Sequence, residues 1–175
     1  SAKANVVMSE MDLQPNYPAP FLAAGFPIYT WLFGCDSLYS TPGVAASGFD
    51  ELAANTLDCL LYFAAQKNQG AHEVASNGRL LGWDHIQETP QLVHACWKHF
   101  QWTGDMSFLK RAYPVCLEAT AHVVAAVDRD KDGYPEGPGL MEQSGMGPER
   151  ISSACYLYAA YESLANMAES LNDTG

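Results

Sequence analysis

Carboxylate and aromatic side chains that could bind and cleave a sugar gather in the long polar segments of this sequence, outside its apolar stretches. Carboxylates accept hydrogen bonds from sugar hydroxyls, and aromatic rings can cover the apolar C–H faces of a sugar ring. The residues are Trp31, Asp36, Glu73, Trp83, Asp84, Tyr134, Glu136 and Glu142. Composition alone fits a carbohydrate site, and it also fits acids that are simply solvated in loops.

Glu142 is the candidate for the chemical step. Glycoside hydrolysis needs two carboxyl groups that flank the scissile bond, and an apolar setting must hold one of them protonated. Glu142 follows Met141 in a loop, residues 133–145, that is rich in glycine and proline. Its position suits a protonated general acid, although composition alone favours a solvated loop acid. Glu136, in the turn after an acidic run, is predicted to be solvated or to bind an ion.

The acidic run DRDKDG carries Asp128, Asp130 and Asp132 at the alternating spacing of a calcium loop. The match ends there, because the last position of such a loop needs a bidentate glutamate and this sequence has Gly139. Asp and Gly are also ordinary turn formers after a helix. We therefore prefer a solvated turn, keep calcium as the alternative, and expect no other cofactor.

Motifs for other chemistries do not occur in the sequence. His72 and Glu73 are adjacent, but Ser76 stands where an HExxH zinc motif requires its second histidine. The other histidines are scattered and are expected to be structural. No serine lies in GxSxG, and no glycine-rich phosphate loop follows a strand, so nucleophilic and nucleotide chemistries are not supported.

The acidic composition limits the partners. The 175 residues include 9 basic and 20 acidic side chains, which gives a net charge of −11. This charge repels nucleic-acid phosphates and anionic membrane surfaces, whereas a neutral carbohydrate is compatible with it. No apolar run approaches the ~20 residues of a membrane span. The five cysteines are far apart, which favours buried free thiols and a cytoplasmic location over a secreted one.

Four amphipathic stretches predict helices, and no alternating pattern predicts a strand, so the expected fold class is all-α. The first helix runs from about residue 48 to 64 with Ser47 as its cap, and the second runs from Thr89-Pro90 to Gly104. The third runs from about residue 105 to 127, bent or interrupted at Pro114. The fourth begins near residue 149, and its predicted inner face is Ile151, Cys155, Tyr158, Ala165 and Ala168.

The connections alternate in length. Residues 1–47 are predicted to be a long ordered loop with a short helix near residues 37–41, followed by helical hairpins over residues 48–171. The second and third helices are joined only by TGD, whereas the other two connections are long and polar. Antiparallel hairpins would place both long connections on one face, where a site is expected.

The motifs WLFGCDS, AHEVASNG, GWDHIQETPQLV, WTGDMSFL, DRDKDGYPEG and GLMEQSGM occur in this order. Together they resemble the six-hairpin (α/α)6-toroid glycoside hydrolases, such as glucoamylases and the amylo-α-1,6-glucosidases of glycogen debranching enzymes. The resemblance covers about residues 20–171. It implies antiparallel hairpins that form part of a toroid, and inverting hydrolysis of α-glucosidic bonds in oligo- or polysaccharides.

The resemblance also implies roles for individual residues. GLMEQSG is similar to the segment that carries the general acid, which gives that role to Glu142. WLFGCDS is similar to the segment that holds the sugar in the cleavage subsite, so Asp36 matches a sugar ligand, although Cys35 stands where an arginine is usual. Glu73 and Asp84 resemble substrate-facing loop residues, and Trp31 and Trp83 are the aromatic candidates beside them.

A complete toroid needs twelve helices, and this sequence predicts about four or five. We therefore expect residues 1–175 to be one segment of a larger catalytic domain, inactive alone, with the general base outside this chain. Its expected partners are a carbohydrate and the rest of the toroid or other copies of the chain. The alternatives are a non-catalytic helical module that binds carbohydrate or acts as a scaffold, and a calcium-stabilised helical domain.

Overall fold

The computed structural model describes residues 2–82, 86–139, 145 and 147–173. Its helices are α1 (Ala2–Met8), α2 (Gly34–Ala46), α3 (Asp50–Ala65), α4 (Glu88–Thr103), α5 (Met106–Val127) and α6 (Ile151–Leu171). Its strands are β1 (Glu10–Met11), β2 (Phe21–Leu22), β3 (Leu32–Phe33), β4 (Glu73–Val74) and β5 (Leu80–Leu81). The fold is mostly helical, with two small antiparallel sheets.

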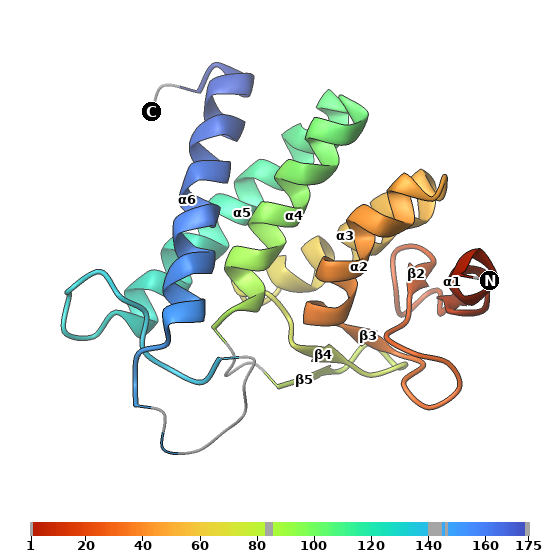
Figure 1. Ribbon diagram of the computed structural model, residues 1–175, viewed down its shortest axis with the longest axis horizontal. Helices are drawn as coiled ribbons and strands as arrows, with labels where there is room; N and C mark the ends of the chain where they lie inside the picture. Colours follow the sequence, from red (N-terminus) through yellow and green to blue (C-terminus); the bar gives the residue numbers. More distant parts are fainter. Residues whose placement is uncertain (1, 83–85, 140–144, 146, 174–175) are drawn as a thin grey trace.

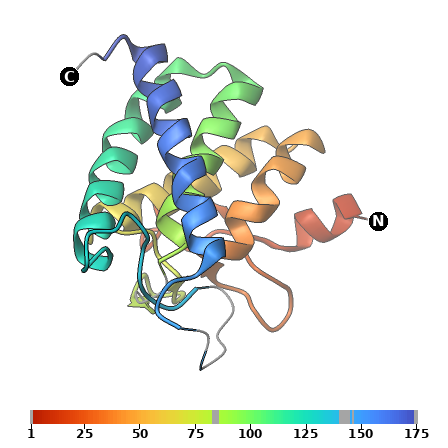
Figure 2. The ribbon, with the colours of Figure 1, turned by 60° about the vertical axis from the view of Figure 1, so that its left-hand side comes forward.

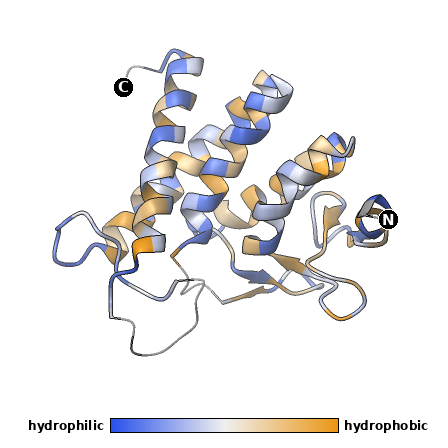
Figure 3. Ribbon diagram, viewed as in Figure 1, coloured by the Kyte–Doolittle hydropathy of each residue, from blue (hydrophilic) through white to orange (hydrophobic). Residues whose placement is uncertain are grey.

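The five long helices form two layers (Figures 1 and 2). Helices α2, α4 and α6 lie side by side in one layer, and α3 and α5 form the second layer behind them. Consecutive helices alternate between the layers, so each pair is an antiparallel hairpin. Apolar and polar residues alternate along these helices, as amphipathic packing requires (Figure 3).

The core lies between the two layers. Leu57 and Phe63 of α3, Leu92 of α4, Leu109 of α5 and Met167 of α6 are all at most 1% exposed. These side chains come from helices that are far apart in the sequence, so the core fixes the spacing of both layers. Burial of each such side chain stabilises the fold by about 1.5–3 kcal/mol.

The prediction that the long connections lie together at one end of the hairpins is confirmed. The short connections after α2 and α4 lie at one end of the layers, while the described parts of the long segments, residues 66–82 and 128–139, lie at the other (Figure 1). Helices α2, α4 and α6 all begin at this second end, which we call the loop end. Their N-termini direct backbone N–H groups that lack partners within the helix, and partial positive charge, towards it.

Strands make the all-α prediction too narrow. In one sheet β1 pairs with β2, and in the other the order is β3-β4-β5, with Phe33 opposite Glu73 and Glu73 opposite Leu81. Each strand has only two residues. Alternation of apolar and polar residues cannot be recognised over so short a stretch, which is why the sequence pattern missed them.

The helix ends match the predictions in part. Gly104 ends α4 with φ +68°, and the Asp105 carboxylate caps α5 by accepting from the Ser107 and Phe108 amides. Pro114 lies within α5 and does not end it. The predicted cap of α3 is wrong, since the Ser47 hydroxyl instead donates to the Gly43 carbonyl at the end of α2. Helix α2 is also longer than the short helix predicted near residues 37–41.

The predicted inner face of α6 is also wrong. Ile151 and Tyr158 are 82% and 65% exposed, and Cys155 and Ala165 are exposed as well. The buried side chains of α6 are Ser153, Leu157, Ala160, Ser163, Leu164 and Met167. Helix α6 therefore carries two apolar faces, and only one of them packs against α4 and α5.

The cysteines follow the expectation of buried thiols for four of the five positions. Cys35, Cys59, Cys96 and Cys116 are buried, Cys155 is exposed, and all five are free thiols. Among the described residues, no helix has both the length and the apolar character needed to cross a bilayer. The cytoplasmic location stays a prediction.

We expect Leu109→Ala to lower the free energy of unfolding by about 2–5 kcal/mol, because it leaves a cavity between the layers. The matched control is Leu117→Ala on the same helix, where 45% of the side chain is exposed. Its loss should stay below about 1 kcal/mol. Urea unfolding monitored by circular dichroism measures both, and equal losses would contradict this location of the core.

Candidate functional site

The loop end is built around two glycines that allow three segments to meet. A Cβ atom on Gly34, at the start of α2, would collide with the Ala71 carbonyl oxygen and lie 3.1 Å from Cγ of Glu88. A Cβ atom on Gly70 would lie 2.7 Å from the Thr89 nitrogen. The Gly34 amide donates to the His72 carbonyl at 2.9 Å, and the Gly70 amide donates to the Thr89 hydroxyl at 2.8 Å. Only residues without a side chain permit this approach.

A histidine and a buried carboxylate pair at this junction. His72 Nδ1 lies 2.7 Å from Oε1 of Glu88, whose side chain is only 1% exposed at the first residue of α4. A carboxylate buried this deeply needs a charged or hydrogen-bonding partner. The His72 ring also contacts Phe33 edge to face, with ring centres 6.2 Å apart. The pair fixes both the imidazole orientation and the entry of α4.

Aromatic rings and a second carboxylate lie beside this pair. The Trp31 indole N–H donates to Oε1 of Glu73 at 2.6 Å, and the Trp31 and Phe33 rings stack with centres 5.7 Å apart. Tyr29 meets both rings edge to face. Because the indole engages Oε1, Glu73 is held in one orientation next to an aromatic surface. This combination of a fixed carboxylate and ring faces suits a hydroxylated ligand.

The beginnings of α4 and α6 are tied together at the same end. The Gln87 amide donates to the Ser152 hydroxyl at 2.7 Å, and it reaches the Ser153 hydroxyl at 3.4 Å. A Cβ atom on Gly139 would lie 3.1 Å from Nε2 of Gln87 and 3.5 Å from Cγ of Arg150. The long connection before α6 therefore returns to the start of α4.

The predicted site residues fall into three groups. Trp31 and Glu73 are in direct contact, as a shared site requires. Asp36 is exposed in the first turn of α2, where the helix N-terminus favours a negative charge, and no hydrogen bond among the described residues joins it to that pair. Trp83, Asp84 and Glu142 lie outside the described residues.

Two residues of this junction were not predicted as site residues, Glu88 and Gln87. Both are 1% exposed, which is rare for their residue types. The available signal was an acid followed by Thr-Pro at a helix start, which the sequence interpretation took as capping by Thr89. That cap is wrong, because α4 begins at Glu88 and the Thr89 hydroxyl accepts from the Gly70 amide. His72, which the sequence analysis considered together with Glu73, contacts Glu88 instead.

Cys35, where the resemblance leads one to expect an arginine, supplies no positive charge. The side chain is buried, and burial raises the pKa of its thiol to about 11, with smaller contributions from Glu88 and Asp36. At neutral pH the thiol is therefore protonated. A cationic sugar ligand is not available at this position.

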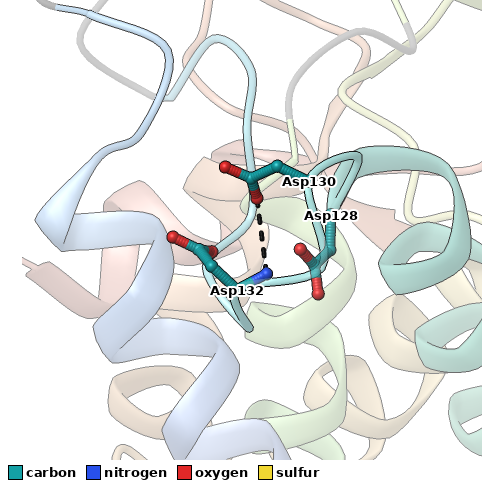
Figure 4. A group of neighbouring side chains, drawn as sticks. All are labelled: Asp128, Asp130 and Asp132. Carbon is teal, nitrogen blue, oxygen red and sulfur yellow. Dashed lines mark hydrogen bonds between the residues drawn. The ribbon is translucent and has the colours of Figure 1, made fainter.

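The Asp128, Asp130 and Asp132 carboxylates gather after the end of α5, as Figure 4 shows, with oxygens within 4.8 Å of one another. Backbone amides already donate to them: Asp132 to Asp130 at 3.3 Å, Gly133 to Asp128 at 3.2 Å and Tyr134 to Asp132 at 2.8 Å. Aspartates at a turn form this type of hydrogen bond without a cation. The geometry fits the preferred interpretation of a turn.

Comparison with known proteins yields a structural similarity. No protein-family model and no curated protein sequence matches the chain. A solved structure, the GH63 mannosylglycerate hydrolase from Thermus thermophilus in complex with Tris, is similar with a TM-score of 0.59 at 15% sequence identity. The alignment covers 99% of this chain and 51% of that chain. The chain thus has the fold of about half of a glycoside hydrolase structure.

We expect Gly34→Ala to lower the free energy of unfolding by at least about 1–3 kcal/mol, because the added methyl group collides with backbone at the junction. Gly43→Ala on the same helix is the control, since a Cβ atom there meets nothing within 4 Å. That change should stabilise the protein by about 0.5–1 kcal/mol. Thermal unfolding compares them, and a neutral Gly34→Ala would contradict the close approach.

For the aspartate turn, we expect millimolar calcium to leave the thermal midpoint unchanged, both in the wild type and in Asp132→Asn. The asparagine keeps an acceptor for the Tyr134 amide and removes one of the clustered charges. Differential scanning fluorimetry with added calcium and with chelator measures the midpoint. A calcium-dependent rise in the wild type that Asp132→Asn abolishes would establish a calcium site instead.

Proposed function

We propose that the chain is part of the catalytic domain of a glycoside hydrolase with an (α/α)6 toroid, and that it contributes the general acid Glu142 and several substrate contacts. The reaction is inverting hydrolysis of α-glucosidic bonds in oligo- or polysaccharides. The observation that carries the proposal is the fold: 99% of the chain aligns with half of a glycoside hydrolase structure.

The loop end supports a carbohydrate site. The N-termini of α2, α4 and α6 converge there, and the Trp31–Glu73 contact sets a carboxylate beside stacked rings. In the proposal, Trp31 and Trp83 cover the sugar ring faces, while Asp36, Glu73 and Asp84 accept hydrogen bonds from hydroxyls. The His72–Glu88 pair positions β4, and with it Glu73, and does not contact the substrate.

Glu142 takes the chemical step in this proposal. As general acid it donates its proton to the glycosidic oxygen while a base-activated water attacks the opposite face of the sugar. The two flanking residues that the structure describes, Gly139 and Gly145, belong to the connection that enters α6 at the loop end. The base comes from helices outside this chain, so the chain alone should not turn over.

The proposal includes a structural partner. The similar hydrolase has about as many residues again without a counterpart here. A ring of hairpins also leaves apolar faces exposed wherever it is open, and large exposed apolar faces are unusual in soluble monomers. The rest of the toroid or further copies of the chain would cover these faces.

A second candidate is a non-catalytic helical module that binds carbohydrate or acts as a scaffold. It is favoured by Cys35, because a buried neutral thiol cannot replace the cationic sugar ligand that the resemblance implies. Isothermal titration with maltooligosaccharides separates the candidates. Binding without hydrolysis in the assembled domain would favour the module.

In the assembled catalytic domain we expect Glu142→Gln to lower kcat by about 10²–10⁴-fold on α-1,4- and α-1,6-linked glucosides, since the amide cannot protonate the leaving group. Glucosides with an activated leaving group should lose less. The matched control is Glu149→Gln, an exposed acid in the same connection. Release of glucose, with its anomer identified by NMR, is the measurement.

Unchanged turnover of Glu142→Gln would reject Glu142 as the acid. Hydrolysis in which the first product retains its configuration would reject the inverting mechanism. No hydrolysis of any α-glucoside by the assembled wild-type domain would reject the proposed substrate class.

A further inference from the structure

Three aromatic rings at every second position, Tyr29, Trp31 and Phe33, form one cluster at the loop end, and we call it the ring cluster. The Trp31 and Phe33 rings lie within 29° of parallel, and the Tyr29 ring is inclined to them by 64° and 82°. Leu32, which lies between two of these residues in the sequence, is fully buried in the core. The buried Leu32 side chain therefore anchors the ring cluster to the rest of the fold.

The ring cluster extends outward from the buried junction. Phe33 contacts the His72 ring edge to face and lies opposite Glu73 in the pairing of β3 with β4. Trp31 is partly exposed and donates its indole N–H to Glu73. Tyr29 is the most exposed of the three, at 55%, and its ring centre lies 6.3 Å from that of Trp31. It is therefore the outermost ring beside the Trp31–Glu73 contact.

Backbone hydrogen bonds hold Tyr29 in place. Its amide donates to the Gly25 carbonyl at 2.7 Å, and its carbonyl accepts from the Gly25 amide at 2.9 Å. The Ala24 amide also donates to the Trp31 carbonyl at 3.4 Å. These bonds close the short loop of residues 25–29 and tie it to the chain that enters β3. A ring on a backbone that is already ordered loses less conformational freedom when a ligand binds.

The Tyr29 side chain offers both an apolar and a polar surface to a ligand. More than half of it is exposed, and its hydroxyl makes no hydrogen bond with the described residues. The buried Tyr17 differs, because its hydroxyl donates to the Val74 carbonyl at 2.8 Å. A sugar unit presents a C–H face and hydroxyl groups, which match an exposed ring with an available hydroxyl.

Exposure alone does not distinguish Tyr29 from its neighbours, but its ring contacts do. Phe26 and Ile28, in the same loop, are 61% and 71% exposed. Among the described residues, neither of them makes a ring contact with the ring cluster, whereas Tyr29 contacts both of the other rings. Tyr29 is therefore the residue of this loop that extends the surface formed by Trp31 and Glu73.

The position of Tyr29 selects the length of the ligand. The spacing of 6.3 Å between the Tyr29 and Trp31 ring centres is comparable with the distance between successive sugar rings in an oligosaccharide. A single sugar unit bound at Trp31 and Glu73 would leave Tyr29 uncovered. A ligand with a second unit reaches Tyr29 and gains a further ring contact.

We propose that Tyr29 forms a second sugar subsite, next to that of Trp31 and Glu73, and that it gives the site a preference for oligosaccharides over glucosides with one sugar unit. The inference rests on the proposed function, because it takes Trp31 and Glu73 as sugar contacts. Tyr29 binds the neighbouring unit and takes no part in bond cleavage.

The test measures ligand binding to the assembled catalytic domain by isothermal titration calorimetry. The ligands are methyl α-glucoside, and maltose and maltotriose with sulfur in place of the glycosidic oxygen, which resist hydrolysis. We expect the affinity of the wild type to rise with ligand length. Tyr29→Ala should lower the affinity for the two longer ligands by about 3–10-fold, because a ring contact is lost. Its affinity for methyl α-glucoside should be unchanged.

Two further variants serve as controls. Tyr29→Phe keeps the ring and should retain most of the gain in affinity with length. Ile28→Ala, at the adjacent exposed position, should leave all three affinities unchanged. In hydrolysis of ordinary maltotriose, Tyr29→Ala should raise KM and leave kcat unchanged, since the lost contact is made equally in the ground state and the transition state.

Two results would overturn the inference: an equal loss of affinity for all three ligands in Tyr29→Ala, which would indicate a merely structural ring, or a gain with length that survives this substitution. Neither result bears on hydrolysis, so the proposed function would stand. Conversely, a gain with length that Tyr29→Ala removes, in a wild-type domain that hydrolyses no α-glucoside, would support the subsite and reject the proposed glycosidase.

Discussion

The close approach of backbone at Gly34 and Gly70 is the constraint on which the loop end depends. Residues without a side chain bring β3, residues 70–74 and the first turn of α4 within contact distance. That approach buries Glu88 and places His72 2.7 Å from it. A buried carboxylate without a partner would be strongly destabilising, so the pair in turn fixes where the segments can lie. The Trp31–Glu73 contact, on the neighbouring strand positions, takes its geometry from this junction.

The two-layer arrangement determines both where the candidate site lies and which helix faces stay exposed. Alternation of the helices between layers places the N-termini of α2, α4 and α6 at the loop end. Their partial positive charges lie at the same end as the His72–Glu88 pair and the Trp31–Glu73 contact. Among the described residues, no third layer covers the outward side of α2, α4 and α6. Exposed apolar side chains of α6, such as Ile151 and Tyr158, lie away from the buried face of that helix.

Several features could be read from the sequence because they depend on local chemistry. Gly104 ends α4, Asp105 caps α5, and the lengths of the connections place the long loops together. The sequence analysis placed Trp31 and Glu73 in the same candidate site, but it did not predict the hydrogen bond between them. The strands were missed because two residues carry no period, and the Ser47 cap was wrong because the hydroxyl found the Gly43 carbonyl. The face of α6 was wrong because both of its sides are apolar, and composition cannot rank two apolar faces.

Helical class, antiparallel hairpins, acidic charge and the residue types available for sugar chemistry follow from the amino-acid sequence alone, since helix periodicity, glycine stops and side-chain chemistry are properties of neighbouring residues. Three-dimensional packing was needed to show that Glu88 is buried against His72, and that Ile151 and Tyr158 remain exposed. Burial depends on which segments distant in the chain pack together. His72 and Glu88 are 16 residues apart in the sequence. They meet because Gly34 and Gly70 let their segments of backbone approach closely, and only the tertiary structure shows that approach.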